Sequence, residues 1–367
     1  MRVAFVHDYL TQYGGAERVL FEMHRLYPQA PVYTSLYDPL AFEGRFDGIE
    51  VRTSFLQGMP GAIRWFRELL PLYPRVFESL DLRDFDLVIS STTSFAKGVF
   101  VGPRTLHVSY INTPTRLLWY PQEYAPRLVP RALRPVLAMF EPSLRRWDLE
   151  AAQRPHVLVA NSRNVARRIR EVYGRDSEVV HCPVDAAGFE RDVPGGGYYL
   201  VMSRLLPYKR VDLAVEACSQ IGAPLVVAGS GPEEERLRAR AASCVRFAGQ
   251  VDDEHRWELI GGARALIVPG VEDFGLVALE AAAAGRPVVA FASGGSLETV
   301  VEGETGLFFY EPTAQALAHA LQRLPAATWD RDRLREHARR FAPDVFRSRL
   351  AALIERSLED FWRREAT

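Results

Sequence analysis

Lysine is rare in this chain, and one lysine lies where it could bind phosphate. Of 367 residues, 45 are Lys or Arg, and only Lys97 and Lys209 are Lys. Lys209 follows Arg204 across a proline turn in Ser-Arg-Leu-Leu-Pro-Tyr-Lys-Arg, directly after an apolar run that predicts a strand. Two cations at the end of a strand can bind a diphosphate, Arg204 through its planar fork and Lys209 as a point charge. The competing interpretation is an exposed basic loop, and the scarcity of lysine weakens it for Lys209.

A second segment, Pro-Gly-Val-Glu-Asp-Phe-Gly-Leu-Val-Ala-Leu-Glu, runs from residue 269 to 280 and carries two carboxylates, Glu272 and Glu280. An apolar run ends at its proline, and a helix is predicted to begin near Phe274. Backbone amides at a helix N-terminus favour phosphate or sugar oxygens. The amides expected there belong to Phe274, Gly275 and Leu276.

The spacing of the two carboxylates bears on their roles. Eight helical residues span ~12 Å along the axis, which is too far for two carboxylates acting on one glycosidic bond. Glu272 and Glu280 would therefore serve different ends of an elongated ligand. The alternative is that Glu272 stabilises the helix terminus and Glu280 is an ordinary solvated residue.

Three glycine-containing loops follow other predicted strands. Gly14 and Gly15 precede a helix and allow a ligand to approach the backbone closely, although they lack a dinucleotide fingerprint. The loop around Gly231 is a weak phosphate-loop signal, and Val251 follows the next strand. A plain tight turn is the competing interpretation for the Gly14–Gly15 pair.

Together these motifs resemble the family 4 glycosyltransferases, which are retaining enzymes of the GT-B fold. The resemblance is specific in the second half of the chain, through Glu272-Asp-Phe-Gly-Leu and the seven-residue spacing to Glu280. It implies that Glu272 contacts the donor sugar, that Glu280 binds the ribose, and that Arg204 and Lys209 bind the diphosphate. It also implies donor-binding positions at Gly14, Gly15, Asn112, Gly231, Val251, Asp273, Phe274, Gly275 and Leu276.

One departure from the family pattern lies at Asn112, in Tyr-Ile-Asn-Thr-Pro-Thr-Arg116, where many relatives have His. Asn can exchange hydrogen bonds but cannot titrate, so a proton-shuttling role at this position is in doubt. Arg116 in the same segment and Lys97 are candidate residues for an acceptor or phosphate. A solvated loop lysine is the competing interpretation for Lys97.

Composition excludes several classes of protein. The net charge is −1 and does not favour nucleic acid. The sequence has no run of about 18 apolar residues that would predict a transmembrane helix. Three scattered cysteines predict neither a disulfide framework nor a zinc site, and a cytoplasmic location is the simplest expectation. No metal constellation is visible, so the expected chemistry needs no metal or cofactor.

The order of elements predicts an α/β protein of two Rossmann-like, doubly wound domains facing a cleft. An N-terminal domain is expected over 1–190 and a nucleotide-sugar domain over 197–342, with a Pro-Gly-Gly-Gly linker between them. A helix over 343–367 could pack back on the first domain. In the first domain a helix is also predicted over 63–70.

The stretch from residue 59 to 80 mixes aromatic residues with arginines. Contact with a membrane surface and a lipid-linked acceptor, core packing, and a subunit contact are the three roles open to it.

The predicted function is a retaining, metal-independent transfer of a hexose from a nucleotide-diphosphate sugar. Mannose from GDP-mannose is favoured because the motifs resemble polysaccharide mannosyltransferases. The acceptor would be a glycan, a lipid-linked sugar or a small molecule. The alternatives are a nucleotide-sugar epimerase of the same fold and a non-catalytic nucleotide-sugar-binding protein.

Overall fold

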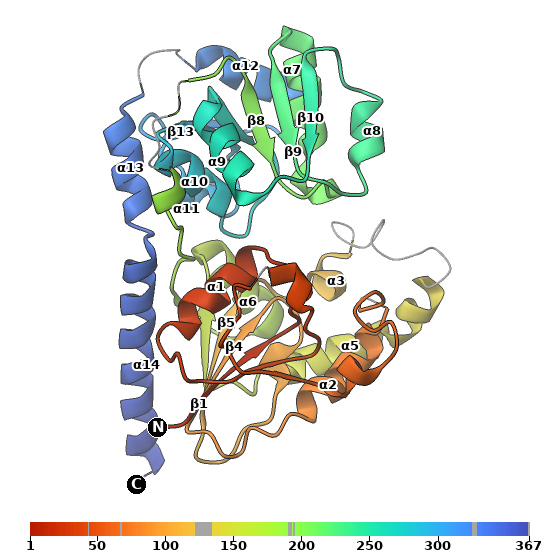
Figure 1. Ribbon diagram of the computed structural model, residues 1–367, viewed down its shortest axis with the longest axis vertical. Coiled ribbons are helices and arrows are strands. Elements are labelled where there is room, and N and C mark those ends of the chain that lie inside the picture. The colour runs from red at the N-terminus through yellow and green to blue at the C-terminus, as the bar shows by residue number, and fades with distance from the viewer. Residues whose placement is uncertain are drawn as a thin grey trace. The chain divides into compact units, whose positions relative to one another are not determined.

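The computed structural model describes residues 1–42, 44–66, 68–121, 134–189, 193, 195–324 and 329–365. The chain divides into two units (Figure 1), an N-terminal unit of Met1–His181 with Phe346–Thr367 and a C-terminal unit of Cys182–Val345. The first unit thus ends nearer the N-terminus than the boundary expected from the glycine linker. Residues 192 and 194 of that linker lie outside the described residues.

The N-terminal unit is built on a parallel sheet of seven strands in the order β3-β2-β1-β4-β5-β6-β7. Its central strands are rich in β-branched residues and buried along their whole length, as expected for a parallel sheet covered on both faces. The strands are β1 (Val3–His7), β2 (Val32–Thr34), β3 (Val51–Thr53), β4 (Leu87–Thr92), β5 (Leu106–Ile111), β6 (Val157–Ala160) and β7 (Glu178–Val179).

Helices and 3₁₀ turns connect these strands. The described helices are α1 (Gly15–His24), α2 (Tyr73–Glu78), α3 (Arg116–Trp119), α5 (Arg134–Ala151) and α6 (Arg163–Tyr173), with turns η1 (Pro39–Phe42), η2 (Phe55–Gly58), η3 (Leu70–Leu72) and η4 (Ala96–Gly98). The start of α6 follows from its sequence, since the hydroxyl of Ser162 accepts a hydrogen bond from the Val165 amide. Its end follows from Gly174, which takes the left-handed conformation at φ 65°.

The helix predicted over 63–70 is wrong. The described residues of that range form turns up to Leu69, Leu70 begins η3, and α-helix begins only at Tyr73. Gly61 has φ +75°, and Pro71 restricts the backbone of the residue before it. These two residues flank the predicted range and disfavour a regular helix that runs through it.

The helix α14 (Pro343–Glu365) packs on the N-terminal unit from Phe346 onward. Phe346 meets the ring of Tyr110 edge-on at 6.0 Å between centroids, and Phe361 meets His156 at 4.9 Å. Arg347 forms an ion pair with Glu22 of α1. Figure 1 shows this helix lying along the N-terminal unit, although it follows the C-terminal unit in sequence.

The C-terminal unit has a second parallel sheet of six strands in the order β10-β9-β8-β11-β12-β13. The strands are β8 (Tyr199–Met202), β9 (Leu225–Ala228), β10 (Val245–Gly249), β11 (Ala265–Val268), β12 (Val288–Phe291) and β13 (Gly306–Phe309). The described helices and turns are η6 (Ala187–Phe189), η7 (Pro207–Lys209), α7 (Val211–Ile221), α8 (Glu234–Arg238), α9 (Asp253–Gly262), α10 (Leu276–Ala283), α11 (Ser296–Thr299), α12 (Ala314–Arg323) and α13 (Arg331–Arg339).

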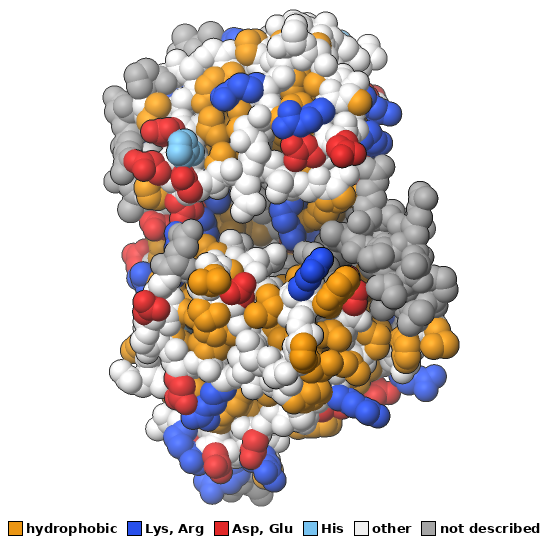
Figure 2. Space-filling model, turned by 45° about the vertical axis from the view of Figure 1, so that its right-hand side comes forward, with side chains coloured by type: hydrophobic (Ala, Val, Ile, Leu, Met, Phe, Trp, Pro, Cys, Tyr) orange, Lys and Arg blue, Asp and Glu red, His pale blue; other side chains and the backbone are white. Residues whose placement is uncertain are grey.

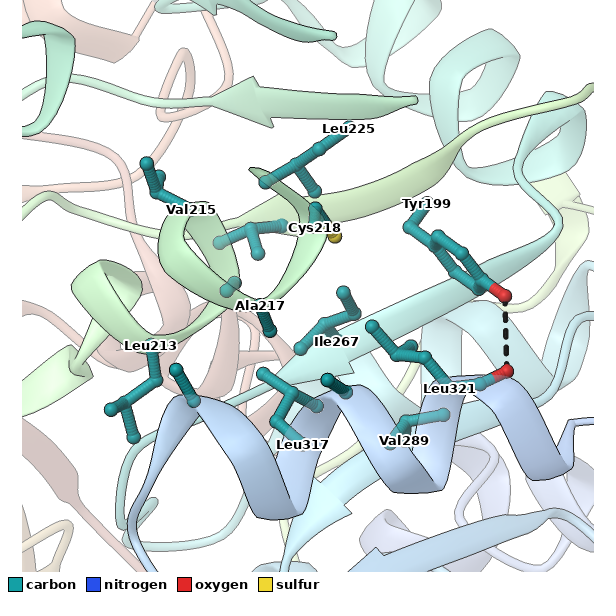
Figure 3. Packing of buried hydrophobic residues seen from close by; sticks show 14 of the residues in the cluster. Tyr199, Leu213, Val215, Ala217, Cys218, Leu225, Ile267, Val289, Leu317 and Leu321 are labelled. Carbon is teal, nitrogen blue, oxygen red and sulfur yellow. Dashed lines mark hydrogen bonds between the residues drawn. The ribbon is translucent and has the colours of Figure 1, made fainter. Parts of the chain in front are cut away.

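Each face of this sheet has its own core, because alternate residues of a strand point to opposite faces. Tyr199 and Val201 pack with α7 and α12, whereas Leu200 packs with α9, α10 and α13. Figure 3 shows the first core, where the Tyr199 hydroxyl donates a hydrogen bond to the Leu321 carbonyl at 3.2 Å. The two parallel sheets confirm the predicted α/β class, and the chain reverses direction across the C-terminal sheet between β8 and β11.

Candidate functional site

The two loops that leave β8 and β11 meet at the point where the strand order reverses. In open parallel sheets, ligands bind beside the carboxyl ends of the strands at such a point. The β8 loop contains Arg204 and ends in η7, and the β11 loop runs from Pro269 to the start of α10. A Cβ at Gly270 would lie 2.4 Å from the Tyr208 carbonyl oxygen, so the two loops pack backbone against backbone.

Lys209 and Glu272 form an ion pair across these loops. The Lys209 ammonium donates to both carboxylate oxygens, at 2.6 Å and 2.7 Å. The two side chains are 16% and 14% exposed, so the pair is partly shielded but still reaches solvent. Arg204 is exposed at the end of β8. The structure therefore brings together Glu272 and Lys209, for which the family resemblance predicts contacts with the sugar and the diphosphate of one ligand.

The helix after Glu272 begins at Leu276, two residues later than predicted. Gly275 is its N-cap and adopts φ 101°, a conformation that favours glycine. Phe274 is buried and packs on Phe341 at 5.7 Å between ring centroids, so its side chain serves the core. The backbone of the Asp273–Phe274 turn lies against Gly295, where a Cβ would approach the Phe274 Cα to 2.4 Å.

Glu280 lies inside α10 and is almost fully buried. Arg256 of α9 forms an ion pair with it. Burial alone would lower the pKa of the Arg256 guanidinium, but the Glu280 charge opposes this and the net direction is upward. Sequence reasoning missed Arg256, because one more arginine on a predicted helix carries no signal in a chain with 45 basic residues.

The remaining donor-binding candidates of this unit lie on the same edge of the sheet. Gly231 has φ 159°, and a Cβ there would come within 2.5 Å of the Leu205 carbonyl oxygen. The loop after β9 therefore packs on the loop that carries Arg204. Val251 follows β10 and is half-buried.

In the N-terminal unit, Gly14 and Asn112 follow the strands β1 and β5. The Gly14 amide donates to the Glu17 carboxylate at 2.8 Å, which fixes the start of α1. Asn112 is buried, and its backbone carbonyl accepts a hydrogen bond from the Asn161 side-chain amide at 3.0 Å. Gly15 begins α1, and Arg116 begins α3.

Asp8 lies at the carboxyl edge of the N-terminal sheet, directly after β1, and sequence reasoning missed it. Its buried carboxylate accepts hydrogen bonds from the Thr92 hydroxyl at 3.0 Å and from the Thr93 amide at 2.6 Å. The Phe95 and Ala96 amides donate to it at 2.8 Å and 2.7 Å. Asp8 therefore ties the loop after β1 to the loop after β4. A carboxylate directly after a buried strand was the available signal.

Lys97 lies in a different setting from the one expected for a ligand-binding lysine. It is 1% exposed, and its ammonium donates to Asp148 of α5 at 2.6 Å. The Asp148 carboxylate also accepts from the Thr115 hydroxyl at 2.7 Å, the Trp119 indole at 2.7 Å and the Tyr173 hydroxyl at 3.0 Å. The structure corrects the expectation for Lys97, because this network gives its ammonium a buried structural role.

The amphipathic stretch from residue 59 to 80 divides into two parts. Tyr73, Val76 and Phe77 are buried in the core of the N-terminal unit. Met59, Ile63 and Trp65 are exposed, Trp65 to 48%. Figure 2 shows hydrophobic side chains gathered on a face of the N-terminal unit. Only the second part is therefore available to a partner or a membrane surface.

The described residues contain no group of three or more His, Cys, Asp or Glu side chains that could hold a metal ion. Within the same ranges, no helix is both long enough and apolar enough to cross a membrane.

Two family models match the chain. Residues 13–187 match the model described as Glycosyltransferase Family 4, and residues 191–341 match Glycosyl transferases group 1. A glycogen synthase of Mycobacterium tuberculosis is 32% identical over 197 residues, which cover 48% of each chain. A GDP-mannose-dependent alpha-(1-6)-phosphatidylinositol monomannoside mannosyltransferase of the same species is 37% identical over 150 residues, covering 36% of this chain and 38% of the relative. The chain thus spans half or less of the length of these two relatives.

Among solved structures, Anabaena Alr3699/HepE in complex with UDP and glucose superposes with a TM-score of 0.73 and 19% identity. The superposition covers 97% of this chain and 99% of that one. At this identity the likeness shows the fold alone, and it confirms the predicted fold of two Rossmann-like domains.

Proposed function

Because the chain belongs to the family 4 glycosyltransferases, we propose that it transfers a hexose from a nucleotide-diphosphate sugar to an acceptor. The observation that carries this proposal is the Lys209–Glu272 pair at the point where the C-terminal sheet reverses its strand order. A cation and a carboxylate this close can bind the two chemically different halves of such a donor.

In the proposed complex, Lys209 and Arg204 bind the diphosphate and stabilise the charge that develops as it leaves. Glu272 accepts hydrogen bonds from sugar hydroxyls. Glu280, held in place by Arg256, accepts hydrogen bonds from the ribose. The turn from Asp273 to Leu276 lies beside the sugar and phosphate, and the loops at Gly231 and Val251 lie beside the nucleoside.

Retention of the anomeric configuration and independence from metal are parts of the same proposal. Two protein cations near the diphosphate would perform the charge neutralisation for which other transferases use a metal ion. Proton NMR of the product should show the configuration of the donor kept, and EDTA should leave the rate unchanged. An inverted product, or a rate lost with EDTA and restored by a divalent metal, would contradict these two parts.

Mannose is the favoured sugar, and the support for it is the mannosyltransferase relative whose name specifies GDP-mannose. The UDP and glucose bound to Anabaena Alr3699/HepE support the competing donor, UDP-glucose. For the acceptor we propose a glycan or a lipid-linked sugar, with a small molecule as the alternative. The exposed residues Met59, Ile63 and Trp65 are the proposed contact with the cytoplasmic face of a membrane that carries such a lipid.

The test is a panel of GDP-, UDP- and dTDP-sugars, scored first by thermal shift and then by transfer to candidate acceptors. A bound donor raises the apparent stability of the folded protein, and transfer releases the nucleoside diphosphate only when an acceptor is present. Conversion of the donor without an acceptor would indicate an epimerase, and binding without turnover would indicate a sensor. Failure of every nucleotide sugar to bind would overturn the proposal.

A further inference from the structure

The Lys209–Glu272 pair is held in place by the backbone on both sides. Lys209 ends η7, and the next residue, Arg210, has φ 50°, the one positive φ outside glycine among the described residues. Glu272 forms a β-bridge with Gly294, and its carbonyl accepts a hydrogen bond from the Gly295 amide at 2.8 Å. A ligand can therefore change the contacts of these two side chains while their backbones stay in place.

Lys209 and Glu272 interact strongly, and a diphosphate that binds Lys209 would have to share this lysine with Glu272. Both carboxylate oxygens accept from one ammonium, and both groups are more than four-fifths shielded from solvent. A diphosphate oxygen bound to Lys209 would bring negative charge close to the Glu272 carboxylate. In a partly shielded site the repulsion between such charges is screened less than in water.

A nucleotide sugar and a bare nucleoside diphosphate differ in what they offer Glu272. The nucleotide sugar carries hydroxyl donors that can hydrogen-bond to the carboxylate as its contact with Lys209 weakens. The bare diphosphate lacks the hydroxyls of the transferred sugar, and its terminal phosphate has an additional ionisable oxygen. The Glu272 carboxylate would thus favour binding of the nucleotide sugar and oppose binding of the nucleoside diphosphate.

Glu280 provides a contrast in the same unit. Its charge is neutralised by Arg256, which lies on α9 and not on either of the loops that follow β8 and β11. Binding of a diphosphate at Lys209 would leave the Arg256–Glu280 pair unchanged. Only Glu272 depends on the cation that the diphosphate also needs.

We propose that the Glu272 carboxylate makes the site select a nucleotide sugar over the corresponding nucleoside diphosphate, by competing with the diphosphate for Lys209. This inference rests on the proposed function, because it takes the ligand to be a nucleotide sugar. It adds a consequence for turnover. Once the sugar has left the nucleotide, Glu272 loses its hydroxyl donors and regains Lys209, which speeds release of the diphosphate.

The test compares the wild-type protein with Glu272→Gln, which keeps the shape of the side chain and removes its charge. GDP and UDP are titrated by calorimetry in parallel, and the matching nucleotide sugars are titrated without an acceptor. We expect Glu272→Gln to bind the diphosphate about tenfold more tightly than the wild type and to gain no affinity for the nucleotide sugar. Glu216→Gln is the matched control, since Glu216 pairs with Arg240 at an exposed site of the same unit, and its affinities should equal those of the wild type.

Tightening of diphosphate binding by less than threefold, or equal tightening for both ligands, would overturn the inference. Glu272→Ala repeats the measurement in case Glu272→Gln does not fold. A wild-type protein that binds neither diphosphate nor either nucleotide sugar would overturn the proposed function and this inference with it. A wild-type protein that binds them, combined with an unaltered Glu272→Gln, would overturn the inference alone.

Discussion

The only two lysines of the chain each pair with a carboxylate, yet the two pairs differ in almost every other respect. The Lys97–Asp148 pair is closed to solvent, with exposed fractions of 1% and 0%. The Lys209–Glu272 pair keeps 16% and 14%. Three further side chains donate to Asp148, whereas Glu272 lies on a loop at the carboxyl edge of its sheet. The comparison indicates that the surroundings of an ion pair decide whether it is enclosed by the fold or stays within reach of a ligand.

The largest expected effect is on stability, in Lys97→Met. Removing one partner of a buried pair leaves an uncompensated charge, which typically costs about 3–5 kcal/mol. Urea denaturation should show this loss in the free energy of unfolding. The control is Arg238→Met, which breaks an exposed pair with Glu234 and should change stability by less than about 1 kcal/mol. A loss below 1 kcal/mol in Lys97→Met would remove the distinction between the two pairs.

The second effect is on activity, in Lys209→Ala. Loss of a group that stabilises developing charge typically lowers kcat by about 10²–10³-fold. The free energy of unfolding should fall by less than in Lys97→Met, because this pair still reaches solvent whereas Lys97–Asp148 is closed to it. Steady-state kinetics with the donor found in the panel, together with urea denaturation, would measure both. Near-normal turnover in a folded variant would contradict the role given to Lys209.

The smallest effect is expected for Tyr173→Phe, which removes one donor to Asp148. Hydrogen bonds to charged groups contribute about 1.5–3 kcal/mol, so a loss of about 2 kcal/mol in the free energy of unfolding is expected at neutral pH.

The effect of Tyr173→Phe should also depend on pH. Burial, followed by the Asp148 charge, raises the pKa of Tyr173 well above its usual value. Because the pKa of Tyr173 is higher in the folded than in the unfolded protein, its protonated hydroxyl contributes fully to stability below about pH 10. This contribution is lost as the pH rises further. Denaturation at pH 8 and pH 11 should therefore show the difference from the wild type shrinking. A constant difference would contradict the assignment.

Much of the fold follows from local patterns in the sequence. The strands Tyr199–Met202 and Ala265–Val268 lie where the apolar runs before Arg204 and Pro269 predict them. Such runs are buried on both faces of a parallel sheet and therefore leave a clear signal. The helix α10 begins two residues later than predicted, because Gly275, with its positive φ, is the N-cap.

The functional residues are harder to predict, because their settings come from distant parts of the chain. Lys97 and Asp148 are 51 residues apart, and Lys209 and Glu272 are 63 apart. The rarity of lysine marked both positions, but local sequence could not show which one would be enclosed. The predicted roles of Glu272 and Glu280 came from family resemblance, and that of Arg204 came also from its position at the end of a strand. All three remain predictions for the experiments above.

The position of α14 has a consequence for the order of events during synthesis. This helix covers the N-terminal unit through Phe346 and Phe361, yet the ribosome makes the part from Phe346 onward after the whole of Cys182–Val345. The C-terminal unit can thus finish folding first, while the unit translated earlier waits with one flank uncovered (Figure 1). During that interval the N-terminal unit exposes apolar surface that a chaperone can bind.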